Sequence, residues 1–364
     1  MIASSRFSAQ AVLIAAVLVF TGAVRAADDN AALVHKDSND AVQSLEKLSA
    51  QLKRDGSGCV IEVNFRNAKI DNSALSHLLG LPNLRSVLLN DAGITDAGLA
   101  TLGKISSLQN LDLRGCKVSN AGLAHLTKLQ TLKALRLAGK NNKTTVDDKG
   151  MASIAKLENL KVLALDFLWV SANGLAQLKP LKNLDELYLA RTLADDDTMA
   201  ALEQFPRLKI LRVAKCQITD DGLKPLAKLP AIEDLDLSEC SQLTDAGLAH
   251  LAGMTQLKRL NLWRDSFTDA GIQHLANMTN MVWLNLDNTQ LTDAGLPSLK
   301  GMKRLAFLHL GSTSVSDAGL QHIEPLKTLK ELSVTRTAVT AEGVAKLEKS
   351  LPNTKIHLRF GREE

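Results

Sequence analysis

One sequence pattern recurs about every 24 residues along most of this chain. Three consecutive copies read LDLSECSQLTDAGLAHLAGMTQLKR from Leu235, LNLWRDSFTDAGIQHLANMTNMVW from Leu260 and LNLDNTQLTDAGLPSLKGMKRLAF from Leu284. A fixed period of this length is typical of stacked supersecondary units, each of which packs only against its neighbours. The 364 residues therefore predict one elongated array of about twelve units rather than two globular domains.

Each repeat, numbered from its first leucine, combines two hydrophobic periods. Positions 1 and 3 are apolar and position 2 varies, as in Leu111 and Leu113, which indicates a short half-buried strand. Apolar residues return at positions 8, 13, 16, 19 and 22, a spacing that fits one turn of helix and a tight return. Because helices need more width than strands, the stack is predicted to be a curved α/β solenoid, a horseshoe with parallel strands concave and helices convex.

Positions 9, 10 and 12 carry a polar signature. Position 9 is always Thr, Ser or Asp, the residues that cap helix N-termini, and position 10 is usually Asp, which complements the helix dipole. Position 12 is usually Gly, which we expect to let the helix pack closely. The adjacent acidic pairs are therefore interpreted as caps and not as catalytic acids. The position-9 residues are Asp71, Thr95, Ser119, Asp147, Ser171, Asp195, Thr219, Thr244, Thr268, Thr292, Ser316 and Thr340.

The pattern LxLxxT/CxIT-DAGL-xxLxxLxxL resembles leucine-rich repeats over residues 60–358. Its T-D-A-G-L form is similar to the cysteine-containing repeats of F-box proteins, and most similar to repeats of exported bacterial proteins of the planctomycete type. The resemblance implies the horseshoe fold. It says little about function, because the family is defined by its scaffold.

The segments outside the repeats set the predicted boundaries. Residues 1–26 resemble a secretory signal peptide, with an apolar run from Ala11 to Phe20 and small residues around Arg25. Residues 27–59 are predicted to be a linker and an amphipathic capping helix over 41–52, residues 60–355 the repeats, and residues 356–364 a capping strand and tail. Cleavage after Ala26 predicts a secreted or periplasmic protein without a membrane span.

Three of the four cysteines occupy position 6, where other copies have Thr. A slot that accepts either residue indicates a small buried corner. Cys216 and Cys240 lie in adjacent repeats, close enough for a disulfide, although buried thiols are the interpretation that the slot favours. Cys116 is the third, and Cys59 precedes the first strand.

No catalytic or metal site is predicted, and we expect no cofactor. His77, His125, His250, His274 and His322 recur at position 15 on the outer helix, where neighbouring helices are too far apart for easy sharing of one ion. No nucleophile elbow is present, and a triad is defined by geometry that an inventory of residues does not supply. The net charge of +4 gives no basic field that would indicate a nucleic-acid partner.

The concave face carries the strongest functional signal. Strand positions 2 and 4 should point outward with position 5 at the rim, and exposed rings on an aromatic-poor chain are typical of interaction hot spots. Phe65 and Trp169 belong to the same ring-bearing group, and a four-residue surplus around Lys140–Thr145 enlarges one rim. The predicted partner-binding residues are Phe167, Tyr188, Arg191, Arg212, Lys215, Trp263, Arg264, Asp287 and His309.

These features favour an exported binding module that recognises another protein through its concave face. One alternative is an F-box-like substrate-recognition subunit of a ubiquitin ligase, but the short segment before the repeats has no room for an F-box of about forty residues. Another alternative is an envelope enzyme that acts on wall polymers. The sequence does not identify the partner or the oligomeric state.

Overall fold

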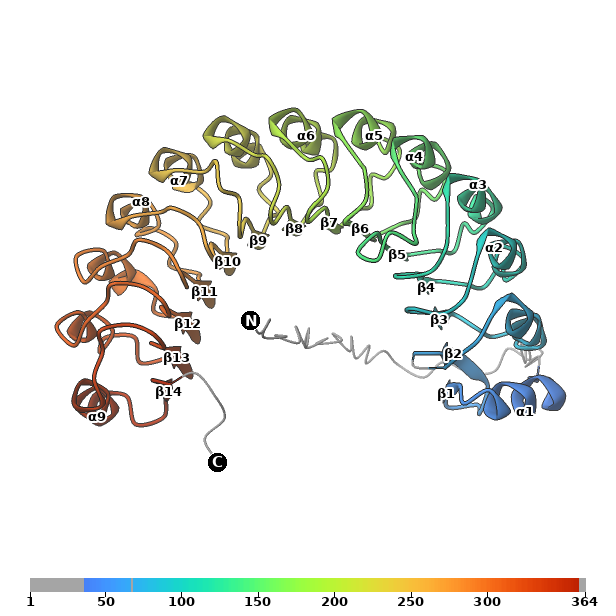
Figure 1. Ribbon diagram of the computed structural model, residues 1–364, viewed down its shortest axis with the longest axis horizontal. Coiled ribbons are helices and arrows are strands. Elements are labelled where there is room, and N and C mark those ends of the chain that lie inside the picture. Colours follow the sequence, from blue (N-terminus) through green and yellow to red (C-terminus); the bar gives the residue numbers. More distant parts are fainter. Residues whose placement is uncertain (1–35, 67, 360–364) are drawn as a thin grey trace, which may run out of the picture. The chain divides into compact units, whose positions relative to one another are not determined.

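The computed structural model describes residues 36–66 and 68–359, which belong to one compact unit that begins at Lys36. Within this unit a single sheet of fourteen strands follows the chain order from β1 to β14. The strands line the inside of the arc of repeats and the helices cover the outside (Figure 1). The structure therefore confirms the predicted α/β leucine-rich-repeat solenoid.

The strands are short, and every neighbouring pair after the first is parallel. They are β1 Gln51–Arg54, β2 Val60–Asn64, β3 Ser86–Leu88, β4 Asn110–Asp112, β5 Ala134–Ala138, β6 Val162–Asp166, β7 Glu186–Tyr188, β8 Ile210–Arg212, β9 Asp234–Asp236, β10 Arg259–Asn261, β11 Trp283–Asn285, β12 Phe307–His309, β13 Glu331–Ser333 and β14 Lys355–His357.

The convex layer mixes α-helices with 3-10 helices. The α-helices are α1 Asn39–Lys47, α2 Asp96–Leu102, α3 Asn120–Leu123, α4 Asp148–Ile154, α5 Ala172–Gln177, α6 Asp196–Ala201, α7 Asp245–Leu251, α8 Asp269–Gln273 and α9 Ala341–Ser350. The 3-10 helices are η1 Asn72–Gly80, η2 Ala124–Leu126, η3 Leu202–Gln204, η4 Asp220–Lys228, η5 Leu296–Gly301 and η6 Gly319–His322. Among these described helices, none combines the length and apolar character that a bilayer span requires.

The core is a stack of aliphatic side chains from positions 1, 3 and 8 and from the helices. Leu235, Leu237 and Leu284 are fully buried, as the alternation predicts. Phe65 is also fully buried, so its predicted place on the concave face is wrong. The register pairs Val63 with Val87 at position 1, and this puts Phe65 at position 3, which faces the core.

The N-terminal end is closed differently from the prediction. Helix α1 begins after the Ser38 cap and ends at Lys47, rather than extending to residue 52, and it buries Ala41 and Leu45 against the first repeat. The chain then forms β1, which pairs antiparallel with β2 and turns the exposed edge into a hairpin. At the other end β14 adds the predicted final strand. The predicted signal peptide and most of the linker lie outside the described residues.

Position 10 has a structural role beyond the helix dipole. In eight repeats its carboxylate accepts hydrogen bonds from both the backbone N–H and the hydroxyl of position 9 in the next repeat. We call this contact the aspartate clasp. Asp220, for example, accepts from Thr244 N at 2.8 Å and from Thr244 Oγ1 at 2.6 Å. The clasp aspartates are Asp96, Asp148, Asp196, Asp220, Asp245, Asp269, Asp293 and Asp317.

The clasp also explains the glycine at position 12. A Cβ atom on Gly247 would overlap the carboxylate of Asp220, and the same holds at the other clasps. Two departures from the pattern support this reading. The sixth repeat has Thr198 at position 12, and the residue that would supply its clasp is Ala172. Where position 9 is Asp147, the preceding position 10 is Asn120, whose amide donates to that carboxylate at 2.7 Å instead of opposing it.

Position 9 caps the helix in most repeats. The side chains of Ser171, Asp195 and Thr268, among others, accept from a backbone N–H of the first turn, as predicted. Thr95 and Thr219 make no such bond. The Thr219 hydroxyl instead donates to Asp196 at 2.6 Å, so the clasp alone engages it there.

Candidate functional site

The concave face presents a row of residues that the sequence reading missed. Each strand begins one residue before position 1, and this residue, here position 0, shares its face with position 2. Position 0 contributes Arg259, Trp283 and Phe307 in three consecutive strands. The rings of Trp283 and Phe307 stack with centroids 5.0 Å apart, and the Arg259 guanidinium lies 4.5 Å from the Trp283 centroid.

Neighbouring acids and a histidine border this aromatic stack. Arg259 pairs with Asp234 at 3.0 Å, and the His309 ring lies 6.3 Å from Phe307. Burial lowers the pKa of His309, against an opposing effect of Asp287. The His309 Nδ1 accepts from the Gly311 N–H at 3.3 Å, which fits the neutral ring. The predicted residues Asp287 and His309 therefore lie together on β11, β12 and the turns after them, without a strong ion pair at neutral pH.

The centre of the face carries Tyr188 and Arg212 at position 2. The Tyr188 hydroxyl donates to Glu186 at 2.8 Å, and burial together with that carboxylate raises the pKa of the phenol. Arg212 pairs with Asp236 on the next strand at 3.2 Å. Both side chains stand on the concave face, as the alternation predicts.

Position 5 is held in the left-handed backbone region along most of the arc. Its φ is 62° at Phe167, 57° at Arg191, 55° at Lys215, and 60° at Glu239 and at Arg264. This region favours Gly, Asn or Asp, and other L-residues pay about 1–2 kcal/mol there. Asp91, Gly115 and Asn288 follow that preference in other repeats, whereas Ser312 and Arg336 near the C-terminal end do not. Five consecutive repeats, the fifth to the ninth, instead place long side chains at this position.

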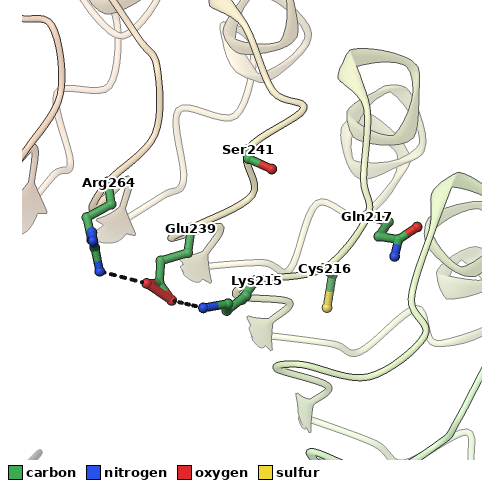
Figure 2. A pocket seen from close by; sticks show the side chains of 6 residues that line it. All are labelled: Lys215, Cys216, Gln217, Glu239, Ser241 and Arg264. Carbon is green, nitrogen blue, oxygen red and sulfur yellow. Dashed lines mark hydrogen bonds and ion pairs between the residues drawn. The ribbon is translucent and has the colours of Figure 1, made fainter.

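Three of those side chains are cations that converge on one carboxylate. Glu239 lies 3.2 Å from Arg264 and 3.5 Å from both Lys215 and Arg191, and only 15% of its side chain is exposed. We call Arg191, Lys215 and Arg264 the cation row. Figure 2 shows Glu239 held between Lys215 and Arg264. One carboxylate for three cations leaves an excess of positive charge, and each cation remains about half exposed.

Rings accompany the cation row at both ends. The Arg191 guanidinium lies 5.2 Å from the Phe167 centroid, and the Arg264 guanidinium lies 5.1 Å from the Trp263 centroid. A shallow hollow of about 380 Å³ lies beside the row, lined by Lys215, Glu239 and Arg264 together with Cys216, Gln217 and Ser241 (Figure 2). The structure thus brings Phe167, Arg191, Lys215, Trp263 and Arg264 into one ionic and aromatic strip.

The cysteine slot is a hydrogen-bonding corner. The thiols of Cys116, Cys216 and Cys240 each donate to a carbonyl of the preceding repeat at 3.2 Å, and no disulfide joins Cys216 to Cys240. Thr289 and Thr313 donate from the same slot to a carbonyl of their own repeat. Burial raises the pKa of Cys116 to about 12 and raises that of Cys216 too, so these thiols are poor nucleophiles.

Asp265 occupies this slot in the ninth repeat. Its side chain is almost fully buried, and neither carboxyl oxygen makes a hydrogen bond. Burial raises its pKa to about 8, and the charges of Asp236 and Glu239 act in the same direction, while the Cys240 backbone opposes them. In neighbouring slots the side chain donates to a backbone carbonyl, and a neutral acid has a proton to donate whereas a carboxylate has none. Burial therefore favours the neutral form of Asp265, which carries no charge to offset the cation row.

Other predicted features lie apart from this strip. The inserted segment Lys140–Thr145 leans toward earlier repeats, with Asn141 Nδ2 at 3.5 Å from Asp91 Oδ1 and from the Gly115 carbonyl. The position-15 histidines lie in or next to the helices of the convex layer. Among residues 36–66 and 68–359, no group of three or more His, Cys, Asp or Glu side chains is arranged to hold a metal ion.

Comparisons with known proteins agree with the repeat architecture. A family model described as Leucine Rich repeat matches residues 104–127 and 207–227. Among solved structures, an internalin (inlF) from Listeria monocytogenes superimposes with a TM-score of 0.59 at 18% identity, covering 90% of this chain and 96% of that one. An internalin C2 from the same organism has 23% identity and a TM-score of 0.42, covering 52% of this chain and 75% of that one. The comparison with curated proteins gave no match.

These findings agree with a leucine-rich-repeat fold. The likeness to the inlF structure concerns the fold, because the identity is low. The specific similarity to planctomycete or F-box repeats receives no support from these matches. The fold by itself does not assign a function, because one scaffold can carry many different binding surfaces.

Proposed function

We propose that this protein is an exported binding module that recognises a protein partner through its concave face. The observation that carries the proposal is that most aromatic side chains lie on the concave face and not in the core. Outside the first 26 residues, the described chain has nine aromatic residues, of which only Phe65, Phe205 and Phe267 are buried in the core. The other six stand on the concave strands or the turns that follow them: Phe167, Trp169, Tyr188, Trp263, Trp283 and Phe307.

This distribution is the reverse of what packing alone would give. Aromatic side chains bury large apolar areas and usually dominate cores, whereas this core is built from Leu, Ile, Val and Ala. Rings on a rigid concave surface, bordered by cations and acids, are the composition that binding hot spots use. Export is supported by the sequence of residues 1–26, and the two parts of the proposal can be tested separately.

Two variants of the mature chain test the binding face. Trp263→Ala and Trp283→Ala each remove a partly buried ring that lies outside the apolar core, so the unfolding midpoint in urea should change little. Capture of envelope proteins by the immobilised chain should weaken about thirtyfold, the equivalent of about 2 kcal/mol for a desolvated ring. His274→Ala, on the convex side, serves as the control and should change neither property.

The result separates three cases. Loss of capture with an unchanged midpoint supports the concave face as the binding surface. Equal capture by both variants and the control refutes it. Unfolding of Trp263→Ala would instead make that ring part of the core and would leave Trp283→Ala as the deciding variant.

A further inference from the structure

The exposed apolar side chains concentrate on one rim. Among the described residues, the large hydrophobic side chains that are exposed are Leu79, Trp169 and Leu193, with 49%, 72% and 45% of their surface accessible. Trp169 and Leu193 occupy position 7 in adjacent repeats. The Leu193 N–H donates to the Val170 carbonyl at 3.0 Å, which joins the two turns. Elsewhere this position is polar or small, as in Lys117, Gln217 and Gln290.

This pair is continuous with the cation row. Arg191 precedes Leu193 by two residues, and Phe167, which lies under the Arg191 guanidinium, precedes Trp169 by two residues. Adjacent strands are about 4.8 Å apart, so the row from Arg191 to Arg264 extends for about 15 Å. That length matches about five residues of extended chain at about 3.3 Å each. We call Trp169, Leu193, Arg191, Lys215 and Arg264 together the rim strip.

The backbone conformation and the side-chain contacts of the cations in the rim strip fix their positions. Arg191, Lys215 and Arg264 occupy left-handed positions that sterics would reserve for small or amide side chains. Their contacts with Glu239, Phe167 and Trp263 fix their directions. Residues held in a strained backbone region cluster at functional sites. The cations are positioned before any partner arrives, which lowers the entropy cost of binding.

From these observations we infer that the rim strip binds an extended acidic segment of a partner protein that also carries one apolar anchor side chain. The carboxylates of the segment pair with the cation row, and the anchor covers Trp169 and Leu193. This inference rests on the proposed binding function and names the partner's chemistry. A polyanion such as nucleic acid fits less well, because Glu239 stands inside the row and the anchor surface is apolar.

Selection from a phage-displayed library of random peptides, each about ten residues long, tests the inference on the full mature chain. The selected peptides should be rich in Asp and Glu and should contain a Trp, Phe or Leu. Their binding, measured by fluorescence anisotropy, should weaken at least about tenfold in Arg191→Glu/Lys215→Glu and in Trp169→Ala. It should also weaken as NaCl is raised from about 50 mM to about 300 mM.

A charge-matched control removes the effect of net charge. Lys156→Glu/Lys300→Glu reverses two exposed lysines of the helical layer and should leave peptide binding unchanged. Circular dichroism should show a folded chain for all variants. Trp169→Ala and the control should keep the native unfolding midpoint, because these side chains are exposed. Arg191→Glu/Lys215→Glu should unfold somewhat earlier, because Glu239 loses two of its partners, so its peptide binding is measured well below its own midpoint.

The inference is overturned if no peptides are enriched, if the enriched peptides are neutral or basic, or if the rim variants bind them as well as the control does. It is also overturned if a mixed-sequence single-stranded DNA oligonucleotide binds the row more tightly than the peptides do. Failure here leaves the concave-face proposal intact if Trp283→Ala still loses envelope capture. Acidic peptides that bind the rim while Trp263→Ala and Trp283→Ala retain capture would refute the concave-face proposal instead.

Discussion

The aspartate clasp predicts that Gly247→Ala lowers the stability of the native chain but raises it when the clasp aspartate Asp220 is absent. The clasp between the seventh and eighth repeats joins Asp220 to Thr244 by two hydrogen bonds, of 2.8 and 2.6 Å. A hydrogen bond to a charged group contributes about 1.5–3 kcal/mol, and the lower end applies where water has access. Asp220→Ala should therefore reduce the free energy of unfolding by about 2 kcal/mol.

Gly247→Ala should cost a similar amount in the native chain. The new Cβ overlaps the Asp220 carboxylate, which has to move and so loses the same two bonds. In the Asp220→Ala background that obstacle is gone, and the other close atom is a flexible methyl group of Leu223 at 3.2 Å. Alanine is favoured over glycine in a helix by about 0.5–1 kcal/mol, so Gly247→Ala should there become stabilising.

Urea unfolding followed by circular dichroism measures the full cycle. The single costs add to about 4 kcal/mol, whereas the double variant should lose only about 1–1.5 kcal/mol, which gives a coupling of about 2.5–3 kcal/mol. Gly253→Ala is the matched control, because nothing lies within 4 Å of its new Cβ, and it should show no coupling to Asp220. Equal effects of Gly247→Ala in both backgrounds would refute the proposed reason for the glycine.

Three further predictions concern the slot, the core and the N-terminus. Asp265 has a folded pKa near 8 against an unfolded value of 3.8, so between these values the folded state binds the extra proton and stability falls as pH rises. The slope this group contributes is about 1.4 kcal/mol per pH unit, and Asp265→Thr, the residue of neighbouring slots, should remove that slope from denaturation curves recorded between about pH 5 and pH 8. Leu237→Ala should cost about 2–5 kcal/mol in urea unfolding, and a harmless result would contradict the strand register. Amino-terminal sequencing of the native protein should begin at Ala27, and an intact Met1 would contradict export.

The fold was predictable from the sequence because each repeat independently shows the same strand, cap and helix pattern. The strand alternation seen at Leu111 and Leu113 and the caps at position 9 recur in every copy. An ambiguous assignment in one repeat is therefore corrected by the same pattern in the others. The errors occurred where the repeat stops. Leu52 continues the apolar pattern of the first helix, but pairing with β2 places it in strand β1, because an unpaired sheet edge gains more from a hairpin than from another helical turn.

The site was predictable only in part, for a specific geometric reason. Numbering from the first leucine placed Trp283 at the end of the preceding repeat, whereas the strand begins one residue earlier and shows this ring on the concave face. Extending the period-two alternation back by one position would have found Trp283, Phe307 and Arg259. The convergence of Arg191 and Arg264 on Glu239 joins residues two repeats and one repeat apart, and it depends on a left-handed backbone that these residue types disfavour.

The mismatch between residue type and backbone conformation at position 5 distinguishes residues kept for the scaffold from residues kept for function. At positions set by the scaffold, the residue types of two contacting positions change together. Position 12 is glycine where an aspartate clasp lies against it, and it is Thr198 where the preceding repeat has Ala172 instead of the clasp aspartate. At position 5 the scaffold favours Asp91, Gly115 or Asn288, yet five successive repeats depart from that preference with long side chains, and Ser312 and Arg336 depart further along the chain. Such departures cost stability and add no core packing, so they are retained for something outside the core. The same block contains Trp169 and Leu193, and it is there that a partner should be sought.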